Sequence, residues 1–352
     1  MNGTCAFFIF RKEGDILDTG NQFLGTERIG KLMRQYAIPC IISLLVGALY
    51  NIVDQIFIAN AAYLGSYGNA ANTVVFPLTV IALGIAVMAG DGCCAFVSLS
   101  LGENKRDKAT KSVGNTVLFC LAASILLTAV YLIFSDPILS LFGADVNAET
   151  KRLSEEYFFF ISLGIPFYMF GQAMNPVIRA DGNPKFAMIS TLAGAVINII
   201  LDPIFIFGFN MGVKGAALAT VLSQACSAAW VLTFLFSKRA SLPLEKPYMK
   251  LDRKIILSIL ALGVSPFIMA STESLVGFVL NSSLKEFGDI YISALTILQS
   301  AMQFASVPLT GFAQGFVPII SYNFGHGDKQ RVKDCFRIVL VTMFSFNLIL
   351  ML

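Results

Sequence analysis

An amide and a carboxylate stand four residues apart in a long apolar run, at Asn198 and Asp202. Residues at this spacing share one face of an α-helix, so the two side chains are expected to lie one turn apart. Pro203 follows at once. An ionisable group inside a membrane is energetically costly unless it faces a cavity or a partner. The pair is therefore a candidate functional site.

Four acidic residues lie within apolar runs: Asp54, Asp91, Asp202 and Glu273. Lysine and arginine are absent from the middle of these runs, so the predicted partner is a proton, a metal cation or a cationic substrate. At about 1.5 Å per residue, Asp54, Asp202 and Glu273 lie roughly 24–27 Å from the inner ends of their runs. Thr220 lies about 8 Å from the outer end of its own run. Asp54, Asp202, Glu273 and Thr220 are therefore expected in the outer half of the bilayer.

Each acidic position also has a purely structural interpretation. Asp202, followed by proline, could cap a new helix that begins with the proline. Asp91 stands between two glycines near the inner interface, where a structural role is equally compatible with the sequence. The hydroxyl residues beside Glu273 could satisfy it locally. A cap alone, however, accounts neither for Asn198 one turn earlier nor for Asp54 at a matching depth.

Composition predicts an all-α polytopic membrane protein around these groups. The 352-residue chain is 56% hydrophobic and only 13% charged, with a mean hydropathy of +0.73. Soluble domains carry about 25% charged residues, and apolar runs of about 20 residues can cross a bilayer. We place nine spans, at Tyr36–Asn60, Ala70–Leu101, Val113–Phe134, Tyr157–Arg179, Phe186–Phe209, Gly215–Ser237, Ile255–Ser282, Ile290–Ser321 and Val332–Leu352.

The basic residues predict the orientation of these spans. With the N-terminus in the cytoplasm, 21 of the 25 lysines and arginines fall in cytoplasmic segments, including those of the loop 238–254. We expect a multi-pass protein of the cell membrane with a cytoplasmic N-terminus. Residues 1–23 hold an apolar patch too short to span and are predicted to be a disordered extension. The net charge of +3 gives no indication of a nucleic-acid partner.

An internal repeat appears at an offset of 223 residues, which aligns Gly92 with Gly315. The same offset aligns Gly102 with Gly325, and the first span of each copy has an early proline, Pro39 or Pro266. The repeat unit has six spans, so both copies enter the membrane in the same direction and are parallel. We expect an N-lobe at 24–237, a cytoplasmic loop at 238–254 and a partial C-lobe at 255–352. With about nine helices of an expected twelve, the chain is predicted to be incomplete at its C-terminus.

The sequence offers no chemistry typical of an enzyme. It contains no P-loop, nucleophile elbow or CxxC motif, and His326 is its single histidine. The seven cysteines lie mostly in apolar spans, which predicts buried free thiols. We therefore expect neither catalysis nor an ATP-driven cycle by this chain alone.

Four motifs carry a family resemblance. They are L-Y-N-I-V-D-Q-I-F-I-A around Asp54, G-I-P at 164–166, R-A-D-G-N-P at 179–184 and I-N-I-I-L-D-P-I-F-I around Asp202. From residue 24 onward the chain resembles the multidrug and toxic compound extrusion (MATE) family of efflux transporters, in its prokaryotic form. The resemblance implies two six-helix lobes about a central cavity, and export of organic cations in exchange for Na⁺ or H⁺.

The resemblance also implies an ion-coupling site in the N-lobe. The family's first-helix aspartate, its fifth-helix asparagine and aspartate, and its sixth-helix threonine correspond here to Asp54, Asn198, Asp202 and Thr220. These residues would be the metal ligands if the coupling ion is Na⁺. The family's first-helix proline corresponds to Pro39, a predicted hinge, where the missing N–H permits bending.

Substrate-cavity residues follow from the same resemblance. Polar cavity positions of the family correspond to Tyr50, Gln172 and Asn175, and a seventh-helix glutamate used by some members corresponds to Glu273. Asp91 is not part of the general family pattern, so the resemblance implies no role for it.

Three functions are weighed. The first is a secondary active multidrug exporter that antiports amphipathic organic cations against Na⁺ or H⁺, needing no cofactor beyond the coupling ion. The second is a flippase for a lipid-linked glycan, whose anionic substrate would require basic cavity residues. The third is a non-transporting membrane sensor or scaffold, which would not need carboxylates at matching depth. For the first, the expected partners are small organic cations and membrane lipid, with no nucleic acid or obligate protein partner, so that the chain is expected to be a monomer.

Overall fold

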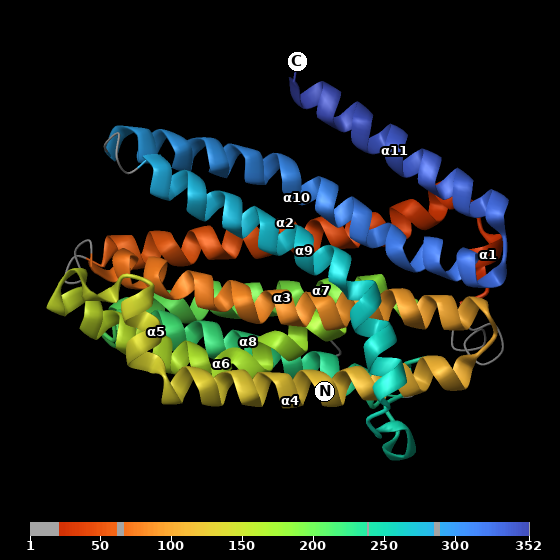
Figure 1. Cartoon of the computed structure of the whole chain (residues 1–352), viewed down its shortest axis with the longest axis horizontal. Helices are drawn as coiled ribbons and strands as arrows, with labels where there is room; N and C mark the ends of the chain where they lie inside the picture. Colours follow the sequence, from red (N-terminus) through yellow and green to blue (C-terminus); the bar gives the residue numbers. More distant parts are fainter. Residues whose placement is uncertain (1–20, 62–66, 238, 285–288, 352) are drawn as a thin grey trace, which may run out of the picture.

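The computed structural model describes residues 21–61, 67–237, 239–284 and 289–351. Most of them are helical, as expected in a bilayer, where backbone polar groups have to be satisfied within their own segment. The described helices, shown in Figure 1, are α1 (Phe23–Thr26), α2 (Ile29–Asn60), α3 (Tyr67–Gly102), α4 (Arg106–Ile133), α5 (Ser135–Leu141), α6 (Ala148–Ala180), α7 (Pro184–Pro203), α8 (Val213–Leu235), α9 (Arg253–Leu284), α10 (Asp289–His326) and α11 (Lys329–Met351).

The predicted all-α membrane architecture is confirmed. Each predicted span lies largely on one long helix, and seven helices in the described part of the chain are long and apolar enough to cross a membrane. Several helices extend beyond the predicted spans, because polar first turns continue them into the interface. The clearest case is α6, which begins at Ala148, nine residues before Tyr157, after Asn147 caps it by accepting a hydrogen bond from the Thr150 amide.

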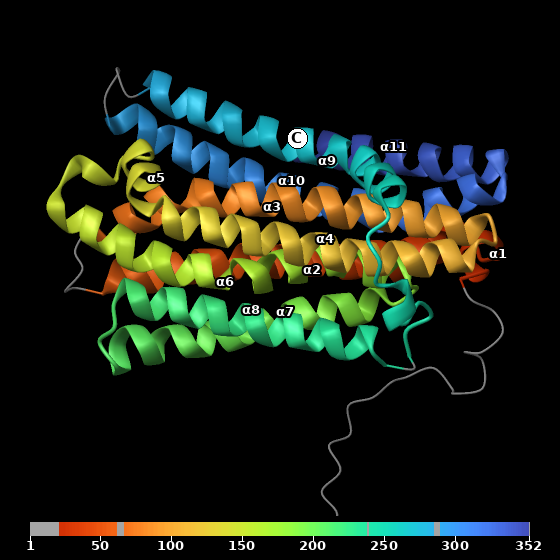
Figure 2. The same ribbon diagram turned by 60° about the horizontal axis from the view of Figure 1, so that its bottom comes forward.

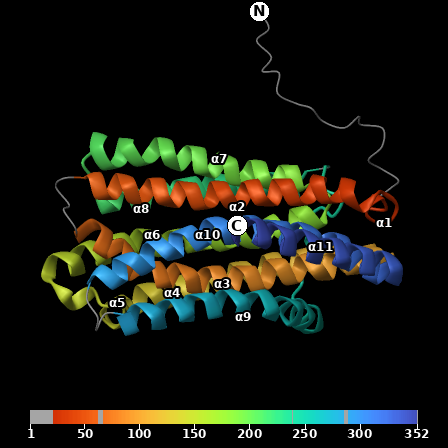
Figure 3. The ribbon, with the colours of Figure 1, turned by 90° about the horizontal axis from the view of Figure 1, so that it is seen from above.

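Helices α2 and α3 join the other N-lobe helices to the helices of the C-lobe. α3 packs against α4 and α6 on one side and against α9 and α10 on the other, while α2 packs between α7 and α10. In Figure 2 the α7–α8 pair and the α9–α10 pair accordingly lie on opposite sides of this central layer. Seen from above in Figure 3, α2 and α7 run side by side along most of their lengths.

Reciprocal glycine contacts relate the two repeats. A Cβ atom on Gly102 would fall 2.0 Å from the carbonyl oxygen of Tyr322, and one on Gly325 would fall 2.2 Å from that of Leu99. Tyr322 and Leu99 are themselves related by the offset of 223 residues, so the contact maps onto itself when the repeats exchange. The prediction that the repeats are parallel, with Gly102 and Gly325 at the same end of the bundle, is confirmed.

The segment between α8 and α9 is fastened to the N-lobe. Asp181, in the turn after α6, accepts hydrogen bonds from the backbone amides of Ser241 at 3.0 Å and Leu242 at 2.7 Å. Asn115 on α4 accepts another from the amide of Asp252 at 2.6 Å. Burial raises the pKa of the Asp181 carboxyl to about 7, even though these amides favour its charged form. The start of α9 is thus held against the N-lobe.

The described structure reaches three residues beyond the predicted boundary at residue 24, to Asn21. Asn21 is buried, and its side chain donates a hydrogen bond to the carbonyl oxygen of Ala180 at 2.8 Å. Phe23 stacks against Tyr36 of α2. The rest of the predicted extension, 1–20, lies outside the described residues.

Candidate cation site

Two helices of the N-lobe present an amide, a carboxyl and a hydroxyl to one another. The Nδ2 atom of Asn198 on α7 donates to Oδ1 of Asp202 at 3.2 Å and to Oγ1 of Thr220 on α8 at 3.4 Å. Asn198 is 1% exposed and Asp202 is fully buried. The four-residue spacing therefore does place the two side chains on one helix face, and that face is turned into the lobe.

The second carboxyl group comes from α2. Asp54 is 7% exposed, and its carboxyl group lies within hydrogen-bonding reach of the Asp202 carboxyl. The packing of α2 against α7 brings them together, although they are 148 residues apart in the chain (202 − 54). The structure thus gathers Asp54, Asn198, Asp202 and Thr220 from three helices.

The oxygens of this cluster outnumber its donors. Atoms Oδ1 of Asp54, Oδ1 of Asn198 and Oδ2 of Asp202 are buried and have no hydrogen-bond partner among the described residues. A buried acceptor without a donor is destabilising, and two adjacent carboxylates also repel each other. A shared proton or a bound cation removes both problems. The residues present therefore fit the coupling-ion chemistry that the sequence implies.

The helix geometry at Pro203 corrects one structural interpretation of Asp202. α7 continues through Asp202 and Pro203 and passes directly into a π-helical turn, Ile204–Gly208. Asp202 is therefore inside a helix, and the interpretation that it only caps a new one is wrong. Pro203 has a helical φ of −63° and simply lacks the N–H that would have bonded to Ile199. The helix widens locally instead of stopping, as it often does at functional sites.

Two tyrosines lie beside the carboxyl pair. Tyr50, one turn before Asp54 on α2, and Tyr157 on α6 are both near enough to Asp54 and Asp202 to interact electrostatically. Tyr50 was predicted as a cavity residue, whereas Tyr157 was missed. Its sequence signal was its place at the outer end of the fourth predicted span, in the same half of the bilayer as the carboxylates.

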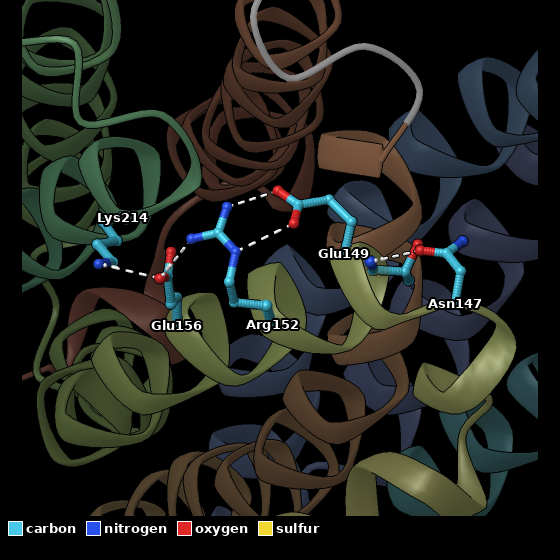
Figure 4. A network of polar contacts seen from close by, with 6 residues as sticks. Asn147, Glu149, Arg152, Glu156 and Lys214 are labelled. Atoms are coloured by element: carbon cyan, nitrogen blue, oxygen red, sulfur yellow. Dashed lines mark hydrogen bonds and ion pairs between the residues drawn. The ribbon is translucent and has the colours of Figure 1, made fainter.

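A polar network fastens α6 to α8 near this tyrosine (Figure 4). Arg152 donates to Glu149 one turn earlier and to Glu156 one turn later, and Lys214 at the start of α8 pairs with Glu156 at 3.1 Å. Asn147 caps the same helix. Each exposed pair contributes little by itself, and of these contacts the Glu156–Lys214 pair joins α6 to α8.

Comparison with known proteins decides the family. The MatE family model matches residues 39–204 and 266–352, which include both carboxylates of the site. The chain belongs to the MatE family. Members of this family are transporters and not enzymes, so the expectation of no catalysis agrees with the match.

Relatives of this MatE protein are multidrug exporters by name. It is 29% identical over 313 residues to the multidrug export protein MepA of Staphylococcus aureus (strain MSSA476), covering 89% of this chain and 68% of that protein. A ligand-bound structure of the MATE multidrug transporter DinF-BH has 35% identity and a TM-score of 0.83, covering 92% of this chain and 72% of the other. A crystal structure of MATE in the straight conformation has 25% identity and a TM-score of 0.86, covering 94% and 73%.

The other predicted cavity residues of this MatE chain are placed as follows. Asn175 on α6 donates to Ala187 at 3.0 Å and to hydroxyls on α7, so it ties these two helices together. Gln172, also on α6, is exposed. Glu273 lies on α9, but its side chain is outside the described residues. Neither Asn175 nor Gln172 is among the four residues of the carboxyl cluster.

A buried ion pair corrects the expectation that the acidic residues lack a basic partner. Arg179, at the predicted end of the fourth span, is 5% exposed and lies 3.6 Å from Asp91 on α3. It also donates to Asn175 and to Gln314 of α10, each at 3.4 Å. Asp91 therefore has a structural counter-ion and stands apart from the cation site.

Proposed function

We propose that this MatE protein exports amphipathic organic cations in exchange for Na⁺ or H⁺, with Asp54, Asn198, Asp202 and Thr220 as the coupling site. The observation that supports this most is the set of buried acceptor oxygens without donors. One shared proton would satisfy the two carboxyl groups as a coupled pair. Alternatively, oxygens from all four residues could hold Na⁺, because hard cations take oxygen ligands.

Coupling requires the ion to favour one conformation over another. Neutralising the carboxyl pair removes the repulsion between α2 and α7 and changes how these helices pack. Pro39 lies fifteen residues before Asp54 on α2, where it weakens the helix ladder. We propose that α2 bends or straightens with the charge state of the pair, which reshapes the N-lobe and drives out the substrate. Tyr50, Gln172, Asn175 and Glu273 are proposed to contact that substrate.

The proposed setting is the cell membrane, with the N-terminus in the cytoplasm and the chain acting as a monomer. The basic residues support this orientation, since 21 of 25 fall on one side of the spans. The multidrug names of MepA and DinF-BH support a broad range of substrates. The charge of the interior supports cationic ones.

Glycan flipping is less well supported than cation export. An anionic substrate requires a positive charge that is free to meet it. Arg179 is a buried arginine that reaches α10 of the other lobe, and Asp91 already pairs with it. A sensor or scaffold is also less well supported, because it would have no need for two adjacent buried carboxyl groups.

Transport in proteoliposomes tests the proposal. The protein is reconstituted and given Na⁺ and pH gradients separately, and efflux of a fluorescent organic cation is followed. Asp202→Asn and Asp54→Asn should each abolish gradient-driven export while the protein stays folded. Asp145→Asn, which changes an exposed carboxylate in the loop before α6, is the matched control and should transport normally. Gradient-driven export that persists in both site variants would refute the assignment.

A further inference from the structure

The segment Asn21–Arg28 crosses from one lobe to the other at the end of the bundle where α2 begins. On the N-lobe side, Asn21 donates to the last carbonyl of α6, at Ala180, and the segment continues directly into α2. Asn21 is 4% exposed, so this bond is shielded from water. We call the segment Asn21–Arg28 the strap.

The C-lobe holds the strap through its backbone carbonyls. The carbonyl oxygen of Leu24 accepts from Nδ2 of Asn323 on α10 and from the guanidinium of Arg331 on α11, each at 3.1 Å. The same guanidinium donates to the carbonyl oxygen of Glu27. Hydrogen bonds from a charged donor are the stronger kind, and one planar guanidinium spans both acceptors.

An apolar contact reinforces these bonds. Leu24 is fully buried in a cluster that is separate from the main core and contains Tyr36 of α2, Phe316 and Tyr322 of α10, and Cys335 of α11. The cluster therefore joins the strap and α2 to two helices of the C-lobe.

The strap lies at an end of the bundle where the lobes are closely packed. Gly102 and Gly325 meet there, and Arg179 reaches Gln314 of the other lobe. A path into the bundle from this end opens only if the lobes part. Because the strap is covalently continuous with α2, parting leaves it on the N-lobe and breaks the bonds from Asn323 and Arg331.

We propose that the strap is a latch that keeps the cytoplasmic end of the transporter closed, and that Arg331 is its release point in the transport cycle. This rests on the proposed function, which supplies the orientation and the need for alternate opening. Arg331 is a positioning residue here, because it acts through the lobes and touches no transported ion.

The test measures the distance between the lobes directly. Spin labels are attached through a keto amino acid at positions 185 and 329, both exposed at this end, so the native cysteines stay unchanged. Double electron–electron resonance spectroscopy then gives the distribution of distances between the two labels, in nanodiscs without substrate. In the parent we expect one dominant short distance. Arg331→Met, which keeps the stem and removes the donors, should raise the ratio of long to short distances about tenfold or more.

Two further variants make the test specific. Arg331→Lys keeps the charge but cannot span both carbonyls, so its shift should fall between those of the parent and Arg331→Met. Arg337→Met changes an exposed arginine further along α11 and should leave the distribution unchanged. If Arg331→Met does not fold, the milder Arg331→Lys still has to show the shift.

Unchanged distances between the labels in the Arg331 variants, or an equal shift in Arg337→Met, would refute the proposal that the strap is a latch. The measurement needs no transport, so its outcome is separate from that of the ion-coupling experiment. A chain that fails to export cations could still show a working latch, and an active exporter could lack one.

Discussion

Replacing Gly102 with alanine should weaken the contact between the two repeats. The added Cβ atom would lie 2.0 Å from the carbonyl oxygen of Tyr322, whereas real Cβ contacts essentially never fall below 3.0 Å. The end of α3 and α10 therefore have to separate by at least 1.0 Å (3.0 − 2.0 Å). Forced insertion of a methyl group into a packed site destabilises by about 1–3 kcal/mol, so the free energy of unfolding should fall by that amount.

The assay is reversible unfolding in mixed micelles of sodium dodecyl sulfate and a mild detergent. The fluorescence of Trp230, the single tryptophan, reports the transition. Gly30→Ala on α2 is the matched control, because a Cβ atom there meets nothing within 4 Å. Alanine favours helix more than glycine, so the control should be neutral or more stable by up to about 1 kcal/mol.

The reciprocal variant sharpens the prediction. Gly325→Ala places its Cβ atom 2.2 Å from the carbonyl oxygen of Leu99, so it should destabilise by a similar amount. The double variant Gly102→Ala/Gly325→Ala should cost less than the two single changes added together, because both force apart the same crossing. Equal stability of Gly102→Ala and Gly30→Ala would refute the reasoning that close packing at this crossing holds the lobes together.

Three other predictions concern the hinge, the buried ion pair and the loop carboxylate. Pro39→Ala should stiffen α2 and slow efflux of a fluorescent cation more than it weakens its binding; efflux at the parent rate would exclude bending here. Arg179→Met should lower the free energy of unfolding by about 3–5 kcal/mol, because it leaves Asp91 buried without a counter-charge, and adding Asp91→Leu should restore most of the loss. The pKa of Asp181 is raised from 3.8 to about 7 in the folded chain, so stability present at low pH should be lost as pH rises from about 4 through about 7. The loss is at most about 4 kcal/mol over that whole range and about 3 kcal/mol between pH 5 and pH 8, and Asp181→Asn should not show it when unfolding is compared at these two pH values.

The membrane spans could be predicted because the bilayer imposes them. A run of apolar residues long enough to cross has one stable solution, a helix, and the spacing of Asn198 and Asp202 then fixes their shared face. The depth of Asp54 could be counted along its own span. These inferences depend only on local sequence and on the thickness of the membrane, and the structure brings the residues together accordingly.

Contacts that depend on how helices pack could not be predicted in the same way. Arg179 opens a loop motif, and a sequence cannot distinguish an arginine that points to water from one that turns back to a carboxylate. Tyr157 carries no motif of its own. Pro203 is compatible both with a helix start and with a widened turn, so tertiary packing decides between them. The strap is held through the backbone carbonyls of Leu24 and Glu27. Because every residue has a carbonyl, the sequence does not single out these two.

The fastened segment before α9 makes this helix a lever. Its base is pinned to the N-lobe through Asp181 and Asn115, so a swing of α9 would pivot about that base. α9 has 32 residues, which at 1.5 Å each gives an arm of about 48 Å. A swing of only about 10° would carry its far tip through an arc of about 8 Å for an arm of that length. A modest rearrangement near the base is thus magnified into a large displacement at the opposite membrane surface.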